Sequence, residues 1–68
     1  MYLGVKNRLK EIRMREHMLS SKDFAKMLGV NYTTYSNWET GISKPTLDAA
    51  FQISQKLNKK VDEIWYSE

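Results

Sequence analysis

A short polar segment, residues 32–37 of this 68-residue sequence, carries the side chains best suited to recognising a partner. They are Tyr32, Thr33, Thr34, Ser36 and Asn37. Each bears a hydroxyl or an amide, groups that donate and accept hydrogen bonds. All are middling or poor helix formers, and the segment contains no Lys, Arg, Leu or Ala. An exposed helix selected for its own stability would use the opposite set of residues, so we interpret the segment as one whose side chains bond to a partner.

Candidates for catalysis are few. The sequence has no cysteine, which excludes disulfides, thiol nucleophiles and thiolate metal sites. His17 is the one histidine, which excludes a histidine-rich zinc site, and no glycine-rich phosphate loop is present. Carboxylates occur, but no pair stands in an evident cleft. We therefore predict that the protein is not an enzyme and uses no metal and no cofactor, and no small-molecule effector is evident.

The charge is mildly basic overall and concentrated near the start of the sequence. The net charge is +3, and seven basic residues accompany three acidic ones between positions 6 and 26. The seven are Lys6, Arg8, Lys10, Arg13, Arg15, Lys22 and Lys26. A basic half fits a polyanionic partner, although a solvated helix surface would have the same composition. The apolar runs are too short for a signal peptide or a membrane span, so we expect a cytoplasmic protein with no membrane contact.

Helix boundary signals surround the polar segment and predict two short helices joined by a tight turn. Ser20 is a good N-cap for the first helix, and Gly29 suits the left-handed residue that ends it. Asn31 caps the second helix, over about 32–40, which ends at Gly41. The polar segment therefore belongs to the second helix of a helix–turn–helix pair.

Apolar periodicity predicts the remaining helices and the core. Val5, Leu9 and Ile12 have the spacing of one helix face, which predicts a helix over about 5–17. Tyr35 and Trp38 are three residues apart and point inward, which leaves the polar side chains on the opposite face. We predict burial of Phe24, Ala25, Met27 and Leu28 in the helix after Ser20, and of Leu47, Ala50, Phe51, Ser54 and Leu57 in a fourth helix capped by Thr46.

A short fifth helix near Val61 and Ile64 completes the expected fold. No stretch has the alternation of a strand. We predict an all-α fold, a compact bundle of five short helices in a single domain over residues 1–68. A chain of this length buries only about 60% of its unfolded surface, so its stability depends closely on how the core packs.

The same residues resemble a known family. The run FAxxLGVxxxxYSxWExGxxxPxLxxAxxI over residues 24–53, with RLKEIR at 8–13, is similar to the Xre/Cro/CI family of helix-turn-helix regulators, which includes the lambdoid phage repressors. The resemblance spans nearly the whole chain. It implies that the first helix of the pair crosses the DNA backbone while the second lies in the major groove.

The resemblance implies roles for individual residues. Tyr32, Thr33 and Asn37 match base-contacting positions; Asn can pair with adenine, and Thr offers a hydroxyl or a methyl group to thymine. Tyr32 could instead reach a phosphate or pack along its own helix. The residues expected at phosphates are Ser21, Thr34, Ser36 and Lys44. Ser21 stands where the family often has a longer Gln, and Lys44 could also be an unengaged surface lysine.

Two further pairs have expected structural roles. Arg13 and Glu39 match a structural ion pair of the family that joins the first helix to the end of the recognition helix. Trp65 either closes the core or belongs, with Tyr66, to a two-fold interface. The connection between the first two helices is one residue longer than the commonest form and lacks the usual glycine.

Three functions compete for this sequence. The first is a sequence-specific transcriptional regulator that binds a palindromic operator in double-stranded DNA as a homodimer and acts either as a repressor, by occupying the DNA, or by touching polymerase from the site. The second is a protein-binding module of the same fold, an antitoxin-like or anti-repressor partner, which the absence of Lys and Arg from the recognition helix would suit. The third, an enzyme, lacks the necessary residues. The sequence favours the first.

Overall fold

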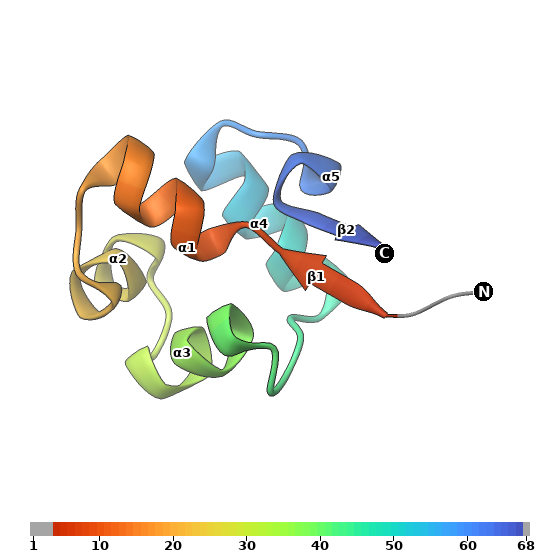
Figure 1. The fold of residues 1–68 in the computed structure, drawn as a ribbon, viewed down its shortest axis with the longest axis horizontal. Helices are drawn as coiled ribbons and strands as arrows, with labels where there is room; N and C mark the ends of the chain where they lie inside the picture. The colour runs from red at the N-terminus through yellow and green to blue at the C-terminus, as the bar shows by residue number, and fades with distance from the viewer. Residues whose placement is uncertain (1–3, 68) are drawn as a thin grey trace.

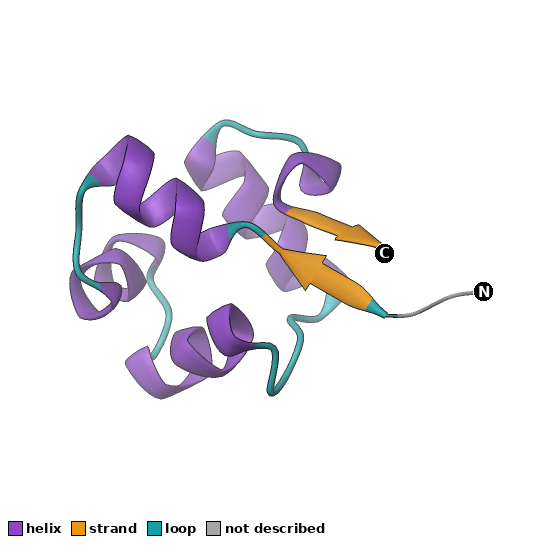
Figure 2. Cartoon of the chain, in the orientation of Figure 1, coloured by secondary structure: helices purple, strands orange, loops and turns teal. Residues whose placement is uncertain are grey.

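The computed structural model describes residues 4–67, which fold into a small bundle of helices with a two-stranded sheet at one side (Figures 1 and 2). The elements are β1 (Val5–Asn7), α1 (Leu9–Ile12), a π-helical turn η1 (Arg13–His17), α2 (Ser21–Leu28), α3 (Tyr32–Thr40), α4 (Leu47–Leu57), α5 (Val61–Ile64) and β2 (Trp65–Ser67). The predicted all-α bundle of five helices, with α2 and α3 as the helix–turn–helix, is confirmed. No helix among the described residues is long and apolar enough to cross a membrane.

The two strands correct the prediction that no strand is present and that Val5 begins a helix. β1 pairs antiparallel with β2, in the register Val5↔Ser67 and Asn7↔Trp65, so the two ends of the described chain lie side by side (Figure 2). Strands of three residues are too short to show a recognisable alternation. The side-chain oxygen of Asn7 accepts a hydrogen bond from the backbone N–H of Leu9 at 3.0 Å, which starts the helix there and not at Val5.

The core lies where α1, α2, α3, α4 and the C-terminal segment meet. Its largest fully buried side chains are Leu9, Phe24, Leu28, Tyr35 and Ile64. The rings of Phe24 and Tyr35 meet edge to face with centroids 5.5 Å apart, a favourable arrangement for two aromatic rings. This contact packs the inner face of α3 against α2.

Three of the predicted core residues are exposed. Met27, Leu47 and Phe51 are 42%, 70% and 53% exposed. The buried stripe of α4 instead consists of Ala50, Ile53, Ser54 and Leu57, which have the i, i+3, i+4, i+7 spacing of one helix face. Both stripes are helical in period, and the sequence alone did not decide which one faces the core.

The connection from α1 to α2 contains a π-helical turn that accommodates its extra length. The backbone N–H of Met18 donates to the carbonyl oxygen of Arg13, five residues back, where an α-helix would reach four. Met18 then adopts a left-handed conformation with φ of 52°, the role that a glycine usually has at a helix end. A turn with one extra residue therefore replaces the glycine that the sequence lacks.

Candidate DNA-binding surface

The turn between α2 and α3 is fixed by side-chain caps on both sides. The hydroxyl of Ser20 accepts a hydrogen bond from the N–H of Asp23 at 3.1 Å, and α2 ends at Gly29 with φ of 73°. The side-chain oxygen of Asn31 accepts from the N–H groups of Thr33 at 2.8 Å and Thr34 at 3.4 Å. These caps, which were predicted, hold the two helices at a fixed angle.

A lysine from α4 also secures this turn. The ammonium group of Lys56 donates a hydrogen bond to the carbonyl oxygen of Leu28 at 2.6 Å, at the end of α2 where carbonyl groups lack helical partners. A Cβ atom added to Gly29 would lie 2.9 Å from this nitrogen. Lys56 therefore has a structural role, and no sequence signal pointed to it.

The inner face of α3 is held by its aromatic side chains. Tyr35 is fully buried, and Trp38 is half-buried against the core. The hydroxyl of Tyr35 donates a hydrogen bond to the carboxylate of Glu39, one turn further on. Burial and this hydrogen bond raise the pKa of the Tyr35 phenol above its ordinary value. These contacts fix the rotation of α3 about its axis.

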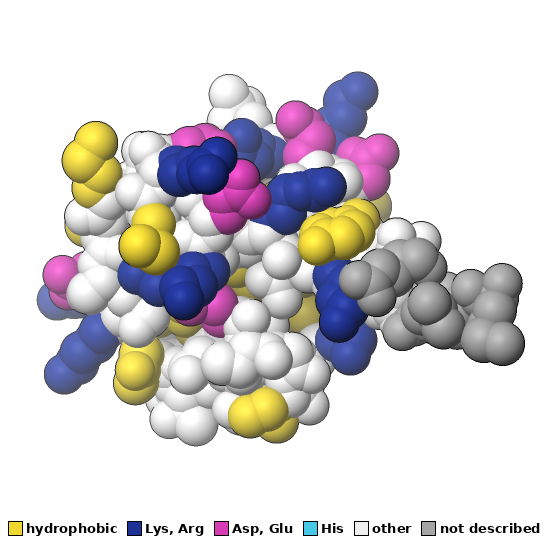
Figure 3. Space-filling view, in the orientation of Figure 1, with side chains coloured by type: hydrophobic (Ala, Val, Ile, Leu, Met, Phe, Trp, Pro, Cys, Tyr) yellow, Lys and Arg dark blue, Asp and Glu magenta, His cyan; other side chains and the backbone are white. Residues whose placement is uncertain are grey.

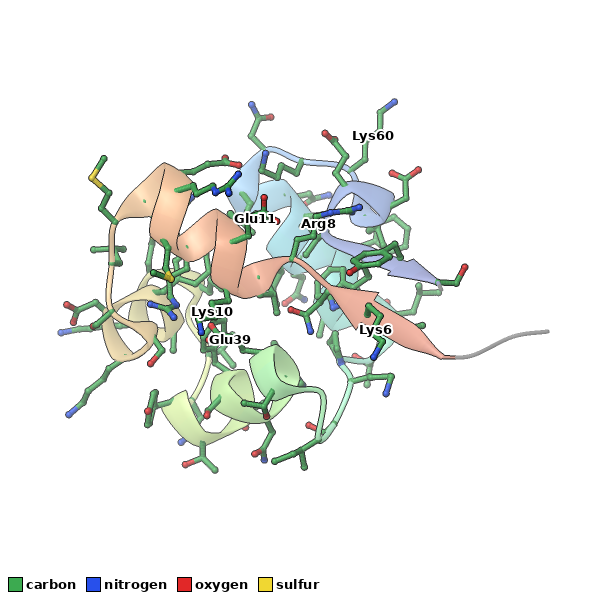
Figure 4. All side chains as sticks on the ribbon, in the orientation of Figure 1. Lys6, Arg8, Lys10, Glu11, Glu39 and Lys60 are labelled. Atoms are coloured by element: carbon green, nitrogen blue, oxygen red, sulfur yellow. The ribbon has the colours of Figure 1, made fainter. Side chains whose placement is uncertain are left out.

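An ion pair anchors the end of α3 to the first helical segment. The guanidinium group of Arg13 donates from Nε to Glu39 Oε2 at 3.1 Å and from Nη2 to Oε1 at 3.3 Å, while Nη1 donates to the carbonyl oxygen of Leu19 at 2.9 Å. The two side chains are 13% and 12% exposed. The hydrogen bond to Glu39 raises the pKa of Arg13. Figure 4 shows Glu39 between α1 and α3, with its charge already compensated.

The outer face of α3 keeps its polar side chains available. Tyr32 is 47% exposed, Thr33 and Thr34 are exposed, and Ser36 and Asn37 are half-buried. Within residues 4–67, no hydrogen bond uses the side chains of Tyr32, Thr33 or Asn37. In Figure 3 the lower part of the surface over α3 is mostly white, and α3 contains no Lys or Arg. α3 therefore presents an uncharged face rich in hydroxyl and amide groups.

A second contact holds α3, this time from β1, and it was not predicted from the sequence. The amide nitrogen of Asn7 donates a hydrogen bond to the carbonyl oxygen of Trp38 at 2.9 Å, while its oxygen accepts one from the N–H of Leu9. Asn7 precedes the N-cap of α1, which is Arg8, and an Asn just before the first buried apolar residue of a helix is a recognisable sign that a helix starts there. The expected helix start at Val5 obscured it.

The comparisons with known proteins agree with this geometry. A family model described as Helix-turn-helix, of the Xre/Cro/CI type, matches residues 9–64. The chain belongs to this family. A protein of Methanocaldococcus jannaschii named as an uncharacterized HTH-type transcriptional regulator is 38% identical over 64 residues, which cover 94% of this chain and 96% of that protein. Membership places the chain among DNA-binding regulators and not among enzymes.

The residues predicted at phosphates lie on three parts of this helix-turn-helix protein. Ser21 is the first residue of α2 and is half-buried, and Thr34 and Ser36 lie on α3. Lys44 is exposed in the loop that follows α3, where it lines a polar cavity of about 330 Å³ together with Lys6 of β1. In the sequence, Ser21 therefore precedes α3 and Lys44 follows it, while Thr34 and Ser36 lie within it.

The two aromatic residues of β2 differ in exposure. Trp65 is 8% exposed and packs in the core of this helix-turn-helix protein. Tyr66 is 37% exposed, and the guanidinium carbon of Arg8 lies 4.2 Å from the centre of its ring, a cation–π contact. Tyr66 therefore has more surface to offer a partner than Trp65 has.

Proposed function

We propose that this protein is a sequence-specific transcriptional repressor that binds a palindromic operator as a homodimer, acting in the cytoplasm. One observation carries the proposal: the outer face of α3 leaves the side chains of Tyr32, Thr33 and Asn37 without hydrogen-bond partners among residues 4–67, while the inner face is fixed by Tyr35 and Glu39. The major groove, about 12 Å wide, admits one such helix. These three side chains are the proposed base contacts.

Phosphate contacts would set the register of the helix on the duplex. We assign them to Ser21, Thr34, Ser36 and Lys44. Contacts of hydroxyl and lysine side chains to phosphates position a protein on DNA without reading its sequence. The first helical N–H groups of α2, beside Ser21, add a favourable partial charge for a phosphate. Arg13 and Glu39 support the surface from behind and would not touch DNA.

The homodimer follows from how little one helix can read. A single α3 contacts only a few base pairs, too few to select one site in a genome. Two copies related by a dyad would place their helices in successive major grooves about 34 Å apart. Occupying such a site blocks other proteins from it, which is how a protein of this size would repress.

Two surfaces could hold the second copy, one at Tyr66 and one formed by Leu47 and Phe51. Tyr66 is the exposed aromatic residue of β2. Leu47 and Phe51, one turn apart on α4, form the second surface. Leu47 borders an apolar cavity of about 230 Å³ that Trp65 and Pro45 also line. Exposed apolar patches of this kind mark association surfaces in small proteins.

Sedimentation equilibrium across a concentration series would locate the dimer interface. We expect the wild-type chain to dimerise, and either Phe51→Glu or Tyr66→Glu to leave a monomer. The variant that stays dimeric serves as the control for the other, and circular dichroism verifies that both remain folded. A wild-type chain that remains monomeric on its operator would refute the homodimer.

A salt titration of binding to duplex DNA tests the regulator itself. The logarithm of the binding constant should fall linearly with the logarithm of salt concentration, by about 0.9 for each phosphate neutralised. Lys44→Ala should reduce this slope by about one unit per protomer, whereas Lys60→Ala, on the far side of the molecule from α3 (Figure 4), should leave it unchanged.

A protein-binding module of the same fold is the alternative, because α3 carries no Lys or Arg. It predicts that no duplex from a random pool is bound at any salt concentration. Selection of a bound duplex from that pool, with two half-sites, supports the regulator and gives its operator directly.

A further inference from the structure

The side chains of α3, and the contacts that some of them already make within the fold, restrict which bases this helix can recognise. In the major groove, guanine is read chiefly by Arg or Lys, cytosine by Asp or Glu, adenine by Asn or Gln, and the methyl group of thymine by apolar or Thr side chains. α3 contains no Arg and no Lys, so the commonest contact to guanine is missing from the helix.

α3 also lacks an available acidic side chain to contact cytosine, for a different reason. Glu39 is the one acidic residue of α3. Its carboxylate accepts hydrogen bonds from Arg13 and from the hydroxyl of Tyr35, and its side chain is only 12% exposed. Moving it into the groove would leave the Arg13 charge without its partner, which costs several times what an exposed ion pair contributes.

The three arginines of the sequence lie outside α3 and have partners within the chain. Arg8 lies over the ring of Tyr66, Arg13 binds Glu39, and Arg15 of η1 forms an ion pair with Glu11 at 3.1 Å. The Arg15 pair is exposed and weak, but Arg15 belongs to an element that does not enter the groove. The guanine contact is therefore not supplied from elsewhere by an arginine.

The side chains that remain favour adenine and thymine. The side-chain amide of Asn37 has no hydrogen-bond partner within residues 4–67, while its backbone carbonyl is fixed by the N–H of Ser43 at 3.2 Å and the hydroxyl of Thr40 at 3.4 Å. Such an amide can make two hydrogen bonds to adenine. The methyl group of Thr33 and the ring of Tyr32 can contact the methyl group of thymine.

From these restrictions we propose that the base pairs contacted by α3 in each half-site are A·T pairs, read by an adenine contact from Asn37 and a thymine-methyl contact from Thr33 and Tyr32. The proposal rests on the proposed function, because it specifies which DNA that function would recognise. It assigns specificity to the major groove and not to the shape of A·T-rich DNA.

Selection of duplexes from a random pool, with wild-type protein and with Asn37→Ala, tests the proposal. The positions at which Asn37→Ala loses its preference are those that this residue reads, and we expect adenine there. Replacing that A·T pair by G·C should weaken wild-type binding roughly 5- to 150-fold. The same replacement should change binding by Asn37→Ala less than twofold.

Replacing thymine by uracil, which removes only the methyl group, tests the second contact. We expect wild-type binding to weaken several-fold at the thymine next to the Asn37 position, and Thr33→Ser, which keeps the hydroxyl and leaves Tyr32 in place, to reduce this sensitivity. If the preference for A·T survives both Asn37→Ala and the replacement of thymine by uracil, it comes from DNA shape, and the proposal is overturned.

The two proposals fail differently. A protein that binds no duplex at all refutes the regulator. A protein that binds a duplex with an invariant guanine at the positions sensitive to Asn37→Ala refutes the A·T assignment alone and leaves the regulator intact. Adenine and thymine at those positions, with the methyl sensitivity reduced in Thr33→Ser, support both.

Discussion

The side-chain amide of Asn7 joins the first strand to the recognition helix, because it donates a hydrogen bond to the carbonyl oxygen of Trp38 at 2.9 Å. The side-chain oxygen of Asn7 also accepts a hydrogen bond from the N–H of Leu9, the first residue of α1. Trp38 lies in the last turn of α3, and its carbonyl oxygen also accepts a hydrogen bond from the N–H of Gly41 at 3.2 Å. The sheet formed by the two ends of the chain therefore helps to position the surface proposed to bind DNA.

We expect Asn7→Ala to lower the free energy of unfolding by about 1–2 kcal/mol, because it removes two hydrogen bonds: the one from the Leu9 N–H, and the one to the Trp38 carbonyl, which then keeps only the N–H of Gly41. Asn7→Asp keeps the oxygen that caps Leu9 but loses the donor to Trp38. Urea denaturation should rank the variants as wild type, then Asp, then Ala. An Asp variant as stable as wild type would show that the link to α3 contributes nothing.

The ion pair between Arg13 and Glu39 should be strongly coupled. Removing one partner strands the other charge in a largely buried position, so Arg13→Met or Glu39→Gln alone should cost about 2–3 kcal/mol. The double variant should cost clearly less than the sum of the two. A double-mutant cycle by chemical denaturation measures the coupling, and additive costs would contradict the structural role assigned to the pair.

Gly29 and Lys56 should also be coupled, through the turn between α2 and α3. Gly29→Ala should cost about 1–2 kcal/mol from its left-handed backbone, and more because the added methyl group displaces the Lys56 ammonium, which lies 2.9 Å away. In a Lys56→Met background only the backbone cost remains. Equal costs of Gly29→Ala in both backgrounds would mean that Lys56 moves aside freely.

Tyr35 should make the fold sensitive to alkaline pH. Its pKa is raised in the folded protein, so the unfolded chain loses the phenol proton first, above about pH 10. Stability from this group is therefore complete below pH 10 and falls by up to about 1.4 kcal/mol for each unit above it. The loss should be smaller in Tyr35→Phe, whose unfolding is followed over the same range, because that side chain has no proton to lose.

Met18 occupies a left-handed backbone conformation with a side chain that is 84% exposed. Met18→Gly should raise the free energy of unfolding by about 0.5–1 kcal/mol, since glycine adopts this conformation without steric cost while its greater freedom in the unfolded chain offsets part of the gain. Met18→Ala retains the Cβ atom and is the matched control. Thermal denaturation of both variants separates backbone strain from loss of the side chain.

Local signals predicted the helix–turn–helix of α2 and α3 well and the tertiary contacts poorly. Ser20, Gly29, Asn31 and Gly41 act on their immediate neighbours, so their positions in the sequence were enough to set the bounds of α2 and α3. Phe51 illustrates the opposite case, because either of two adjacent stripes of α4 had the apolar period of a buried face.

Contacts between distant segments left no local trace. Val5 pairs with Ser67 across the whole chain, and Lys56 reaches a carbonyl group of α2 from α4. A strand of three residues or a single lysine has no period to recognise. Neither the β-sheet nor the Lys56 contact was therefore predictable from residue patterns.

The central claim is that the outer face of α3 enters a duplex, and amide chemical-shift changes on adding the selected duplex to isotope-labelled protein test it most directly. The largest changes should fall on residues 32–37, with further changes at Ser21 and Lys44 and only small ones on α5. Unchanged signals for Tyr32, Thr33 and Asn37, with the changes gathered on another element, would contradict the account.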